Sequence, residues 1–387
     1  MHDLCTYLIS MAKLLYFISE DWFFCSHFLE RAKSAQRAGH QVLVFTRFNS
    51  HQAQLKREGF RVVPLYMERS GINVFREIGV LRQVWRAYRA ERPDLVHQVA
   101  LKPILYGSLV ARWLGIRSVV NAPVGMGYVF TAQGTGRRML RGLVRLALRG
   151  LLNSPGSKVV FENEEDLESS VRSGSVRAHD AVLIRGAGVD LMRFTPACAP
   201  SGTPVVVLGA RMLRDKGVVE FVEAARLLRA RGVDVRCVLV GAPDRANPSS
   251  LTQEQLQHWQ AECVVEWWGH CADMVEVLRR SHIACLPSYR EGLPKFLLEA
   301  MACGLAVVST DVTGCRQAVE PGVTGLLVPA GEAGALAQAL ERLVRNAQER
   351  AAMGRAGRER VQRLFGSERV IDETLALYAA LADRATP

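Results

Sequence analysis

The sequence lacks any run of about 18 uncharged apolar residues, the length that crosses a bilayer, so no segment is predicted to span a membrane. An apolar stretch does occur near the start, from Leu4 to Ile18, but Lys13 interrupts it and no small-residue cleavage site follows. It is therefore not read as a signal peptide. Met11 opens a sequence typical of a first strand, and residues 1–10 are interpreted as a non-native extension or a misassigned start.

Cysteine pairs and metal-ligand clusters are also lacking. The nine cysteines include no Cys-x-x-Cys pair, and no His or acidic residues stand at metal-ligand spacing. The cysteines are therefore expected to be reduced and mostly buried, and no metal site is predicted.

The excess of positive over negative charge lies entirely in one half of the chain. Residues 1–195 hold 27 Lys and Arg against 16 Asp and Glu, a net of +11, whereas residues 196–387 hold 22 of each. This asymmetry indicates a polyanionic neighbour for the first half, either nucleic acid or anionic lipid. Aromatic residues make up only 7% of the chain and no nucleic-acid-binding motif occurs, so no nucleic acid partner is expected.

The chain alternates short apolar runs with helical patterns, which is typical of parallel doubly wound α/β sheets. This rhythm occurs twice, on either side of the Pro/Gly/Ser-rich stretch 195–204. We therefore expect a domain over 1–195, a second over 203–366, and a last helical segment over 367–387 that crosses back to the first. The expected strands are Leu14–Ile18, Gln41–Phe45, Arg61–Pro64, Leu95–His97, Ser118–Asn121, Val205–Leu208, Arg236–Val240, Val264–Trp267, Ile283–Leu286, Ala306–Ser309 and Gly325–Val328.

The stretch 287–304 carries the most chemistry. It follows an expected strand and contains a glycine turn, then Pro294, which suits the first turn of a helix. The backbone N–H groups of Gly292, Leu293 and Lys295 and the helix dipole are expected to form an anion site. Glu291 and Glu299 can line the same pocket, where their carboxylates would accept hydrogen bonds from vicinal hydroxyls. This combination fits a sugar nucleotide; the alternative is a surface loop with capping glutamates.

A second stretch, 209–217, follows the strand Val205–Leu208. It places Arg211 and Lys216 at the carboxyl end of that strand, just before a helix. Two cations in this position are a natural counter-charge for a diphosphate leaving group, although a solvated basic turn has the same appearance.

These motifs, in this order and spacing, resemble the family 4 glycosyltransferases. The matching residues are Gly-Ala-Arg at 209–211, Lys-Gly at 216–217, Pro-Ser-x-x-Glu-Gly at 287–292, Glu-Ala-Met-Ala at 299–302 and Gly-x-x-Gly-Leu-Leu-Val at 322–328. The resemblance implies the α/β GT-B fold, in which two Rossmann-like doubly wound domains face each other across a cleft. It also implies retention of the anomeric configuration without a metal or other cofactor, and no Asp-x-Asp triplet occurs. In the family the counterparts of Arg211 and Lys216 hold the diphosphate, that of Glu291 the transferred sugar and that of Glu299 the ribose.

The first half resembles transferases that extend lipid-linked glycans for capsule, O-antigen or exopolysaccharide. The resembling segments are 19–27, 96–103, 125–130, 161–166 and 186–194. The implied donor is a UDP-hexose or UDP-N-acetylhexosamine, and the implied acceptor is a lipid-linked glycan. The implied location is the cytoplasmic face of the cell membrane, as a peripheral protein.

The first half also departs from the family pattern. Glu20-Asp21-Trp22 replaces a glycine pair after the first strand, and Ala122-Pro123-Val124-Gly125 stands where many members carry a histidine. No general base is therefore assigned. His97 at a strand end is a candidate acceptor contact or, equally, a structural histidine. Lys102, Gly125 and Gly127 complete the acceptor-side candidates.

Residues 137–149 form a basic amphipathic pattern. Arginines recur at 137, 141, 145 and 149, and Leu140, Leu143, Val144, Ala147 and Leu148 form the apolar side. The pattern is typical of an interfacial helix on anionic lipid, and also of a domain helix whose leucines face the core.

Two other functions share some of these features. A sugar-nucleotide epimerase has the same architecture but needs no acceptor, and the Glu-x7-Glu pair disfavours it. A non-enzymatic basic binding protein would explain the charge but not the intact donor-site residues.

Overall fold

The computed structural model describes residues 11–67, 74–124, 146–198 and 200–382. Its contacts divide the chain into two compact units, each of which is described by itself. Unit 1 comprises residues 1–184 and 371–387, and unit 2 comprises residues 185–370. None of the helices in the described parts of the chain is long and apolar enough to cross a membrane.

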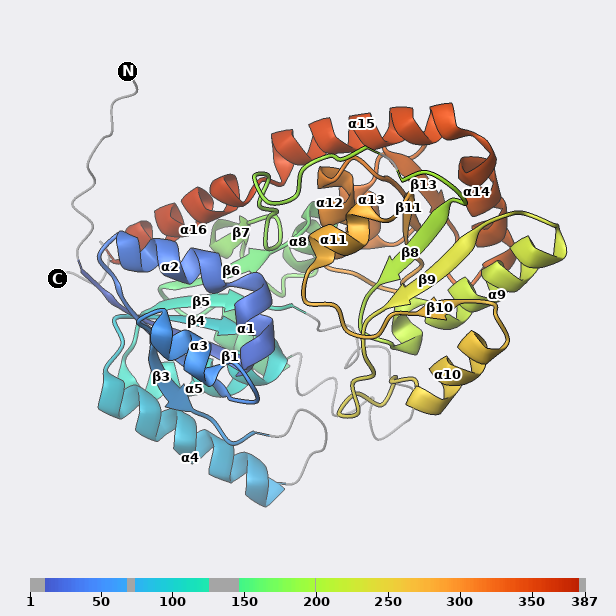
Figure 1. Ribbon diagram of the computed structural model, residues 1–387. Coiled ribbons are helices and arrows are strands. Elements are labelled where there is room, and N and C mark those ends of the chain that lie inside the picture. The colour runs from blue at the N-terminus through green and yellow to red at the C-terminus, as the bar shows by residue number, and fades with distance from the viewer. Residues whose placement is uncertain (1–10, 68–73, 125–145, 199, 383–387) are drawn as a thin grey trace. The chain divides into compact units, whose positions relative to one another are not determined.

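Unit 1 is built on a seven-stranded sheet in the order β3-β2-β1-β4-β5-β6-β7 (Figure 1), with all neighbouring pairs parallel. The strands are rich in Val, Leu and Phe because both faces of the sheet are covered. They are β1 (Lys13–Glu20), β2 (Gln41–Arg47), β3 (Arg61–Pro64), β4 (Leu95–Val99), β5 (Ser118–Ala122), β6 (Ser157–Phe161) and β7 (Ala181–Leu183).

Helices cover both faces of this sheet. Leu15 and Phe17 of β1 point into a core formed with α4 (Val74–Glu91) and α5 (Leu101–Leu114). Tyr16 points to the other face, where its ring contacts Phe24 of α1 and Phe28. Further helical segments of the described part of this unit include α1 (Asp21–His27), α2 (Leu29–Arg37), α3 (Gln52–Arg57), α8 (Glu164–Arg172) and the 3-10 turn η1 (Ala178–Asp180).

Unit 2 repeats the plan with a six-stranded parallel sheet in the order β10-β9-β8-β11-β12-β13. Its strands are β8 (Val205–Gly209), β9 (Arg236–Val240), β10 (Glu266–Trp267), β11 (Ile283–Leu286), β12 (Ala306–Thr310) and β13 (Gly325–Val328). Its helical segments are η2 (Arg214–Lys216), α9 (Val218–Ala230), α10 (Gln253–Ala261), α11 (Met274–Arg279), α12 (Lys295–Ala302), α13 (Thr313–Ala318), α14 (Ala333–Arg345) and α15 (Ala347–Leu364).

Both sheets run outward in chain order from their first strand in one direction and then continue on its other side. The order therefore reverses between β1 and β4 in unit 1, and between β8 and β11 in unit 2. In open α/β sheets such switch points lie beside the carboxyl ends of the strands, where ligands bind.

The chain changes units twice. It leaves unit 1 after Ile184, ahead of the Pro-rich stretch 195–204, because residues 185–194 pack within unit 2. There Val189 pairs with Gly366, and the Arg358 guanidinium donates to the carbonyl oxygens of Leu191 and Phe194. The chain re-enters unit 1 within α16 (Ser367–Ala382). The Tyr378 hydroxyl of α16 is hydrogen-bonded to the Tyr16 hydroxyl at 2.8 Å.

The structure differs from the sequence expectations at several places in unit 1. Strands β6 and β7 were not expected, because each contains an apolar run of only three residues, Val159–Phe161 and Ala181–Leu183. Strand β4 runs on through Gln98 to Val99, so His97 lies in the middle of the strand and not at its carboxyl end.

Candidate functional site

The two motif loops of unit 2 lie side by side at the switch point. The first, residues 210–217, follows β8, and the second, residues 287–294, follows β11. These strands are direct neighbours, with Val206 paired to Ile283 and Val207 to Ala284. The backbone N–H of Tyr289 donates to the carbonyl of Asp215 at 3.0 Å, which joins the loops directly. Sequence segments about 75 residues apart therefore form one surface at the carboxyl edge of the sheet.

Glu291 is the centre of this surface. Its Oε1 accepts hydrogen bonds from the ammonium of Lys216 at 2.6 Å and from the hydroxyl of Ser288 at 2.6 Å. The side chain of Glu291 is 10% exposed and that of Lys216 is 22% exposed. Because both donors bind the same oxygen, the carboxylate is oriented while its Oε2 remains available for a further hydrogen bond. The sequence motif contains Ser288, but nothing in it indicated that this hydroxyl orients Glu291.

Arg211 is held by a residue that the sequence did not single out. Its Nη1 lies 2.7 Å from Oδ2 of Asp244, in the loop after β9. This loop is tied to the first motif loop by the Met212 N–H to Ala242 carbonyl bond and by an antiparallel bridge between Leu213 and Ser250. Since the region around Asp244 carries no recognisable motif, only the fold brings this carboxylate to Arg211.

Helix α12 begins beside Glu291. Pro294 is the residue before its first turn rather than within it, and no side chain caps the helix. Glu299 is 7% exposed, and the ammonium of Lys295 lies 3.3 Å from its Oε1. Burial raises the pKa of Glu299, and the charge and hydrogen bond of Lys295 oppose this effect. Leu293 is largely buried beside Gly186, so its side chain anchors the loop in the core of unit 2.

Two glycines hold the 287–292 loop closely against neighbouring backbone. A Cβ on Gly217, which has φ +70°, would lie 2.0 Å from the carbonyl oxygen of Pro287. A Cβ on Gly314 would lie 2.3 Å from the carbonyl oxygen of Gly292. Neither approach is possible for a larger residue without moving backbone. The position of the second motif loop is therefore set by α13 on one side and by the first motif loop on the other.

The acceptor-side candidates lie in different surroundings within unit 1. His97 is 1% exposed and lies between β1 and α16, where Nδ1 is 2.6 Å from the Tyr378 hydroxyl and the ring stacks on Tyr16. Burial, together with the charge of Arg31, lowers the pKa of His97 to about 3. The acceptor contact expected for His97 does not fit this enclosure; the structural alternative does.

Lys102 lies at the start of α5. Its ammonium is 2.7 Å from Oε1 of Glu77 on α4, and the Tyr106 hydroxyl donates to the other oxygen of the same carboxylate. Lys102 thus joins two helices on one face of the unit 1 sheet. Gly125 and Gly127 lie outside the described residues.

The basic segment 137–149 is described only from residue 146 onward. Residues 146–152 are helical, and Leu148 is 4% exposed in a core cluster with Ile104 and Val159. Leu148 was assigned to the apolar side that would meet lipid. In the part that the structure describes, Leu148 faces protein, whereas Ala147 of the same side and Leu146 are exposed.

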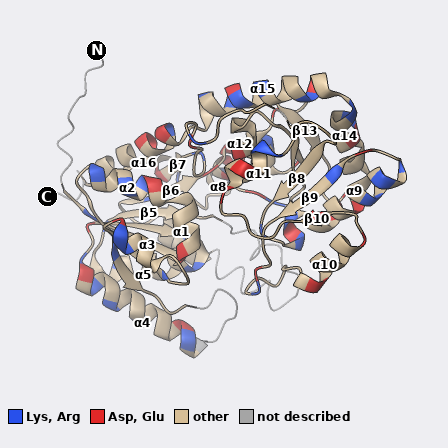
Figure 2. Cartoon of the chain, viewed as in Figure 1, with Lys and Arg blue, Asp and Glu red and all other residues tan. Residues whose placement is uncertain are grey.

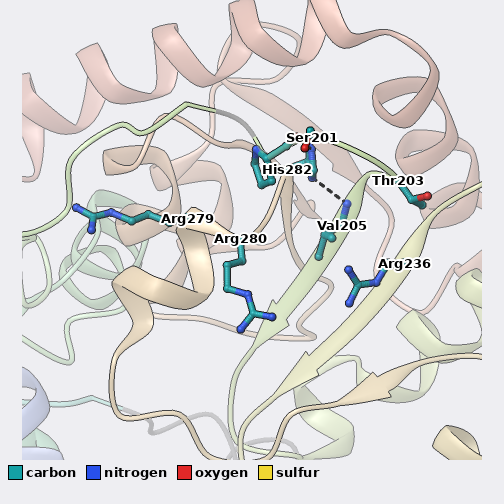
Figure 3. Close-up of a pocket in the computed structure, with 8 residues that line it drawn as sticks. Ser201, Thr203, Val205, Arg236, Arg279, Arg280 and His282 are labelled. Carbon is teal, nitrogen blue, oxygen red and sulfur yellow. Dashed lines mark hydrogen bonds between the residues drawn. The ribbon is translucent and has the colours of Figure 1, made fainter.

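A hollow of about 320 Å³ lies at the opposite, amino edge of the unit 2 sheet (Figure 3). It is lined by the starts of β8 and β9 and by Arg280 and His282; the Arg279 side chain points away from Arg236. His282 Nδ1 accepts from the Val205 N–H at 3.0 Å and Nε2 is 2.9 Å from the Pro200 carbonyl. This histidine thus fastens the stretch 195–204 to the sheet, and the hollow is separate from the motif loops.

No group of three or more His, Cys, Asp or Glu side chains is placed to hold a metal ion within the described parts of the chain. The ion pairs at the candidate site are those of Arg211, Lys216 and Lys295 with Asp244, Glu291 and Glu299.

Two family models match the chain. "Glycosyl transferases group 1" matches residues 197–360, and "Glycosyl transferase 4-like" matches residues 13–153. The chain is 28% identical over 299 residues to the N,N'-diacetylbacillosaminyl-diphospho-undecaprenol alpha-1,3-N-acetylgalactosaminyltransferase of Campylobacter jejuni, covering 74% of this chain and 77% of that one.

Solved structures show the same fold. Sucrose-phosphate synthase from Thermosynechococcus elongatus superimposes with a TM-score of 0.77 at 22% identity, covering 97% of this chain and all of that one. Anabaena HepE in complex with UDP and glucose superimposes with a TM-score of 0.75 at 18% identity, covering 95% of this chain and all of that one. With two parallel Rossmann-like sheets and both family models matched, the chain belongs to the group 1, family 4-like glycosyltransferases of GT-B fold.

Proposed function

We propose that this protein is a retaining glycosyltransferase that moves a hexose or N-acetylhexosamine from a UDP-sugar to a lipid-linked glycan in surface polysaccharide synthesis. The observation that carries the proposal is the arrangement around Glu291. A carboxylate held through one oxygen by Lys216 and Ser288 stands at the switch point of a doubly wound sheet, beside the start of α12. Such a group can accept a hydrogen bond from a sugar hydroxyl while cations and helix dipole receive the phosphates.

The proposed roles of Lys216 and Arg211 follow from their positive charge. Departure of UDP from the sugar places negative charge on the β-phosphate, and Lys216 and Arg211 supply the opposite charge where it develops. Both cations are paired with carboxylates, at 2.6 Å to Glu291 and 2.7 Å to Asp244. These carboxylates hold the cations in place before the diphosphate binds, which reduces the rearrangement that binding requires. The departing phosphate then accepts the proton of the acceptor hydroxyl, so no protein base and no metal ion is assigned.

Glu299 is proposed to bind the ribose. Its carboxylate lies on the first turns of α12, one helical turn beyond Lys295, and it is nearly buried. A buried carboxylate is costly unless it is hydrogen-bonded, and the vicinal hydroxyls of a ribose are two suitable donors. Lys295 compensates the charge in their absence.

The acceptor is proposed from the relatives. The Campylobacter jejuni protein is, by its name, a transferase that acts on an undecaprenol-diphosphate-linked sugar. A lipid-linked acceptor would bring this chain to an anionic membrane surface as a peripheral protein, in keeping with the net charge of +11.

The test is to incubate the purified full chain with UDP-, GDP- and ADP-sugars and an undecaprenyl-diphosphate-linked sugar, with and without EDTA. The expected result is transfer from one UDP-sugar, undiminished by EDTA, with the anomeric configuration of the product retained by NMR. An inverted product would remove the retaining mechanism. A new sugar nucleotide formed without acceptor would instead support the epimerase.

Donor binding is tested separately by thermal shift with UDP, GDP, ADP and CMP. A nucleotide at 100 times its Kd stabilises the chain by about 2.7 kcal/mol, which is easily observed. We expect the largest shift with UDP. No shift with any nucleotide, together with no transfer, would refute the proposed donor site.

A further inference from the structure

Helix α4, the outermost helix on its face of unit 1 (Figure 1), presents an unusual outward stripe. Five exposed residues, Phe75, Ile78, Arg82, Arg86 and Arg89, follow one another at spacings of three and four. At 100° per residue this spacing places them within one narrow arc of the helix. Val80, Val84 and Tyr88 on the opposite arc are buried in the core. The stripe therefore faces outward along the whole helix.

The first turns of this stripe expose large apolar side chains. Phe75 is 86% exposed and Ile78 is 44% exposed. Tyr66, which is 76% exposed, lies next to α4, because its backbone N–H and carbonyl are bonded to the Gln83 side chain of that helix, at 2.9 and 3.3 Å. Single exposed hydrophobic residues are ordinary, but two on the first turns of one stripe, with a third beside the same helix, indicate a contact surface.

The remaining turns of the stripe are basic, and Figure 2 shows the bands of basic residues along α4. The acidic residues of α4 are Glu77 and Glu91, and both are engaged by other cations. Glu77 is bonded to Lys102 at 2.7 Å, and Glu91 to Arg61 at 2.8 Å. The charge of the three stripe arginines is therefore not compensated by acids of their own helix.

An aromatic ring supports the basic turns. The guanidinium of Arg89 lies 4.8 Å from the ring centre of Trp85, which is half-buried beside the stripe. Arginines along a helix, with Phe, Ile, Tyr and Trp at or beside their stripe, match the boundary between lipid headgroups and acyl chains. Apolar side chains enter that boundary while guanidinium groups bind the phosphates. Ile78 has no comparable role against nucleic acid, where bases stack on aromatic rings.

We infer that the outward stripe of α4 is the surface by which this protein docks on anionic lipid headgroups. The inference rests on the proposed function in expecting a membrane acceptor, and it names the surface that meets the membrane. It moves that surface away from residues 137–149, whose described end packs Leu148 into the core.

The experiment is co-sedimentation of the full chain with vesicles of phosphatidylglycerol and phosphatidylcholine, and with phosphatidylcholine alone. The triple variant R82E/R86E/R89E should lower the partition coefficient on anionic vesicles by at least about 100-fold, since each arginine near such a surface contributes about fivefold. The double variant Phe75→Ser/Ile78→Ser should lower it by at least about tenfold. Binding to phosphatidylcholine alone should be weak for all.

A matched control reverses three exposed arginines elsewhere, R172E/R355E/R363E, and changes the net charge by the same amount. It should sediment as the unaltered protein does. If the triple α4 variant does not fold, R86E and F75S singly should each give a partial loss. Thermal melting and the UDP-induced shift, measured on every variant, should match the unaltered protein.

Three outcomes would overturn the inference. The first is unchanged sedimentation of the α4 variants with anionic vesicles. The second is equal release of the control variant from those vesicles. The third is release of the variant R137E/R141E/R145E when the α4 variants remain bound. If a single-stranded RNA oligonucleotide binds the protein as tightly as the anionic vesicles do and displaces them, the stripe is a nucleic-acid-binding surface instead. Failure of the proposed function is separate, because it would appear as absent transfer to a water-soluble acceptor analogue by the unaltered protein, whatever the vesicles show.

Discussion

The two switch points of this protein have the same topology and different contents. In unit 1 the carboxyl end of β1 is followed by Asp21, which is fully buried and accepts the backbone N–H groups of Asn49, Ser50 and His51 at 2.8, 3.1 and 2.9 Å. Burial acts to raise the pKa of Asp21, but these hydrogen bonds outweigh it and the pKa is lowered. In unit 2 Glu291 is held through one oxygen by a cation and a hydroxyl.

The difference shows that a switch point alone does not make an anion site. At the unit 1 switch point the acidic side chain is used to fasten the loop after β2, which is a structural task. In unit 2 the neighbouring loops bring Arg211 and Lys216 to the edge of the sheet, and their acidic partners orient them. We therefore expect a negatively charged ligand to bind at the second arrangement and not at the first.

Of the residues at the two switch points, Lys216 is expected to give the largest effect on activity when it is replaced. Lys216→Ala should lower kcat by about 100-fold, because it removes the charge proposed to face the leaving diphosphate and one donor to Glu291. Glu291→Gln should lower turnover by at least about tenfold. The measurement is steady-state transfer from the UDP-sugar. Arg226→Ala is the control, because this α9 residue pairs with Glu223 and Glu262 and not with the motif loops, and turnover should stay within about twofold. Near-normal turnover in both site variants would refute the assignment.

Asp21 offers the structural counterpart. Asp21→Ala should lower the free energy of unfolding by about 2 kcal/mol, since three backbone N–H groups lose a charged acceptor. Asp21→Asn keeps two acceptor sites and should cost about half as much. Chemical denaturation measures both, and the UDP-induced thermal shift should persist. Loss of that shift in folded Asp21→Asn would mean that the two switch points are not independent.

The buried His97 of unit 1 makes the free energy of unfolding depend on pH. Its pKa of about 3 lies below the ordinary 6.5, so the unfolded chain binds the proton first as pH falls. Stability from this group is complete above about pH 6.5 and is lost progressively toward pH 3, by about 2 kcal/mol between pH 7 and pH 5. His97→Gln should make the unfolding free energy flatter over that interval. Parallel pH curves for the two proteins would contradict the burial of a neutral imidazole.

Ser288 gives the smallest expected effect. Ser288→Ala should lower kcat about fivefold, because Glu291 loses one of the two donors that orient its Oε1. Ser309→Ala is the matched control, since its hydroxyl is equally buried at the same edge of the sheet but donates to the Leu286 carbonyl. Equal losses of kcat in the two variants would assign Ser288 a packing role only.

Much of the fold could be predicted because its signals are local. The expected strands Arg61–Pro64, Arg236–Val240, Ile283–Leu286 and Gly325–Val328 coincide with the structure, as apolar runs of four or five residues bounded by turn residues do not depend on distant partners. Strand β7 was not predicted because the apolar run Ala181–Leu183 is too short to indicate a strand. Residues of the candidate site were named from motifs, but Asp244 was missed because its loop has no motif, and its role follows only from contact with Arg211.

Residue order and composition are enough to indicate two α/β units, to match them to glycosyltransferase families, and to show the excess of positive charge in the first half. These properties depend on residue order and composition alone. The folded structure is needed to see that β8 lies against β11, that Lys216 and Ser288 bind one oxygen of Glu291, and that Leu148 faces protein. Such pairings depend on which distant elements bury their apolar faces together, and no local pattern contains that information.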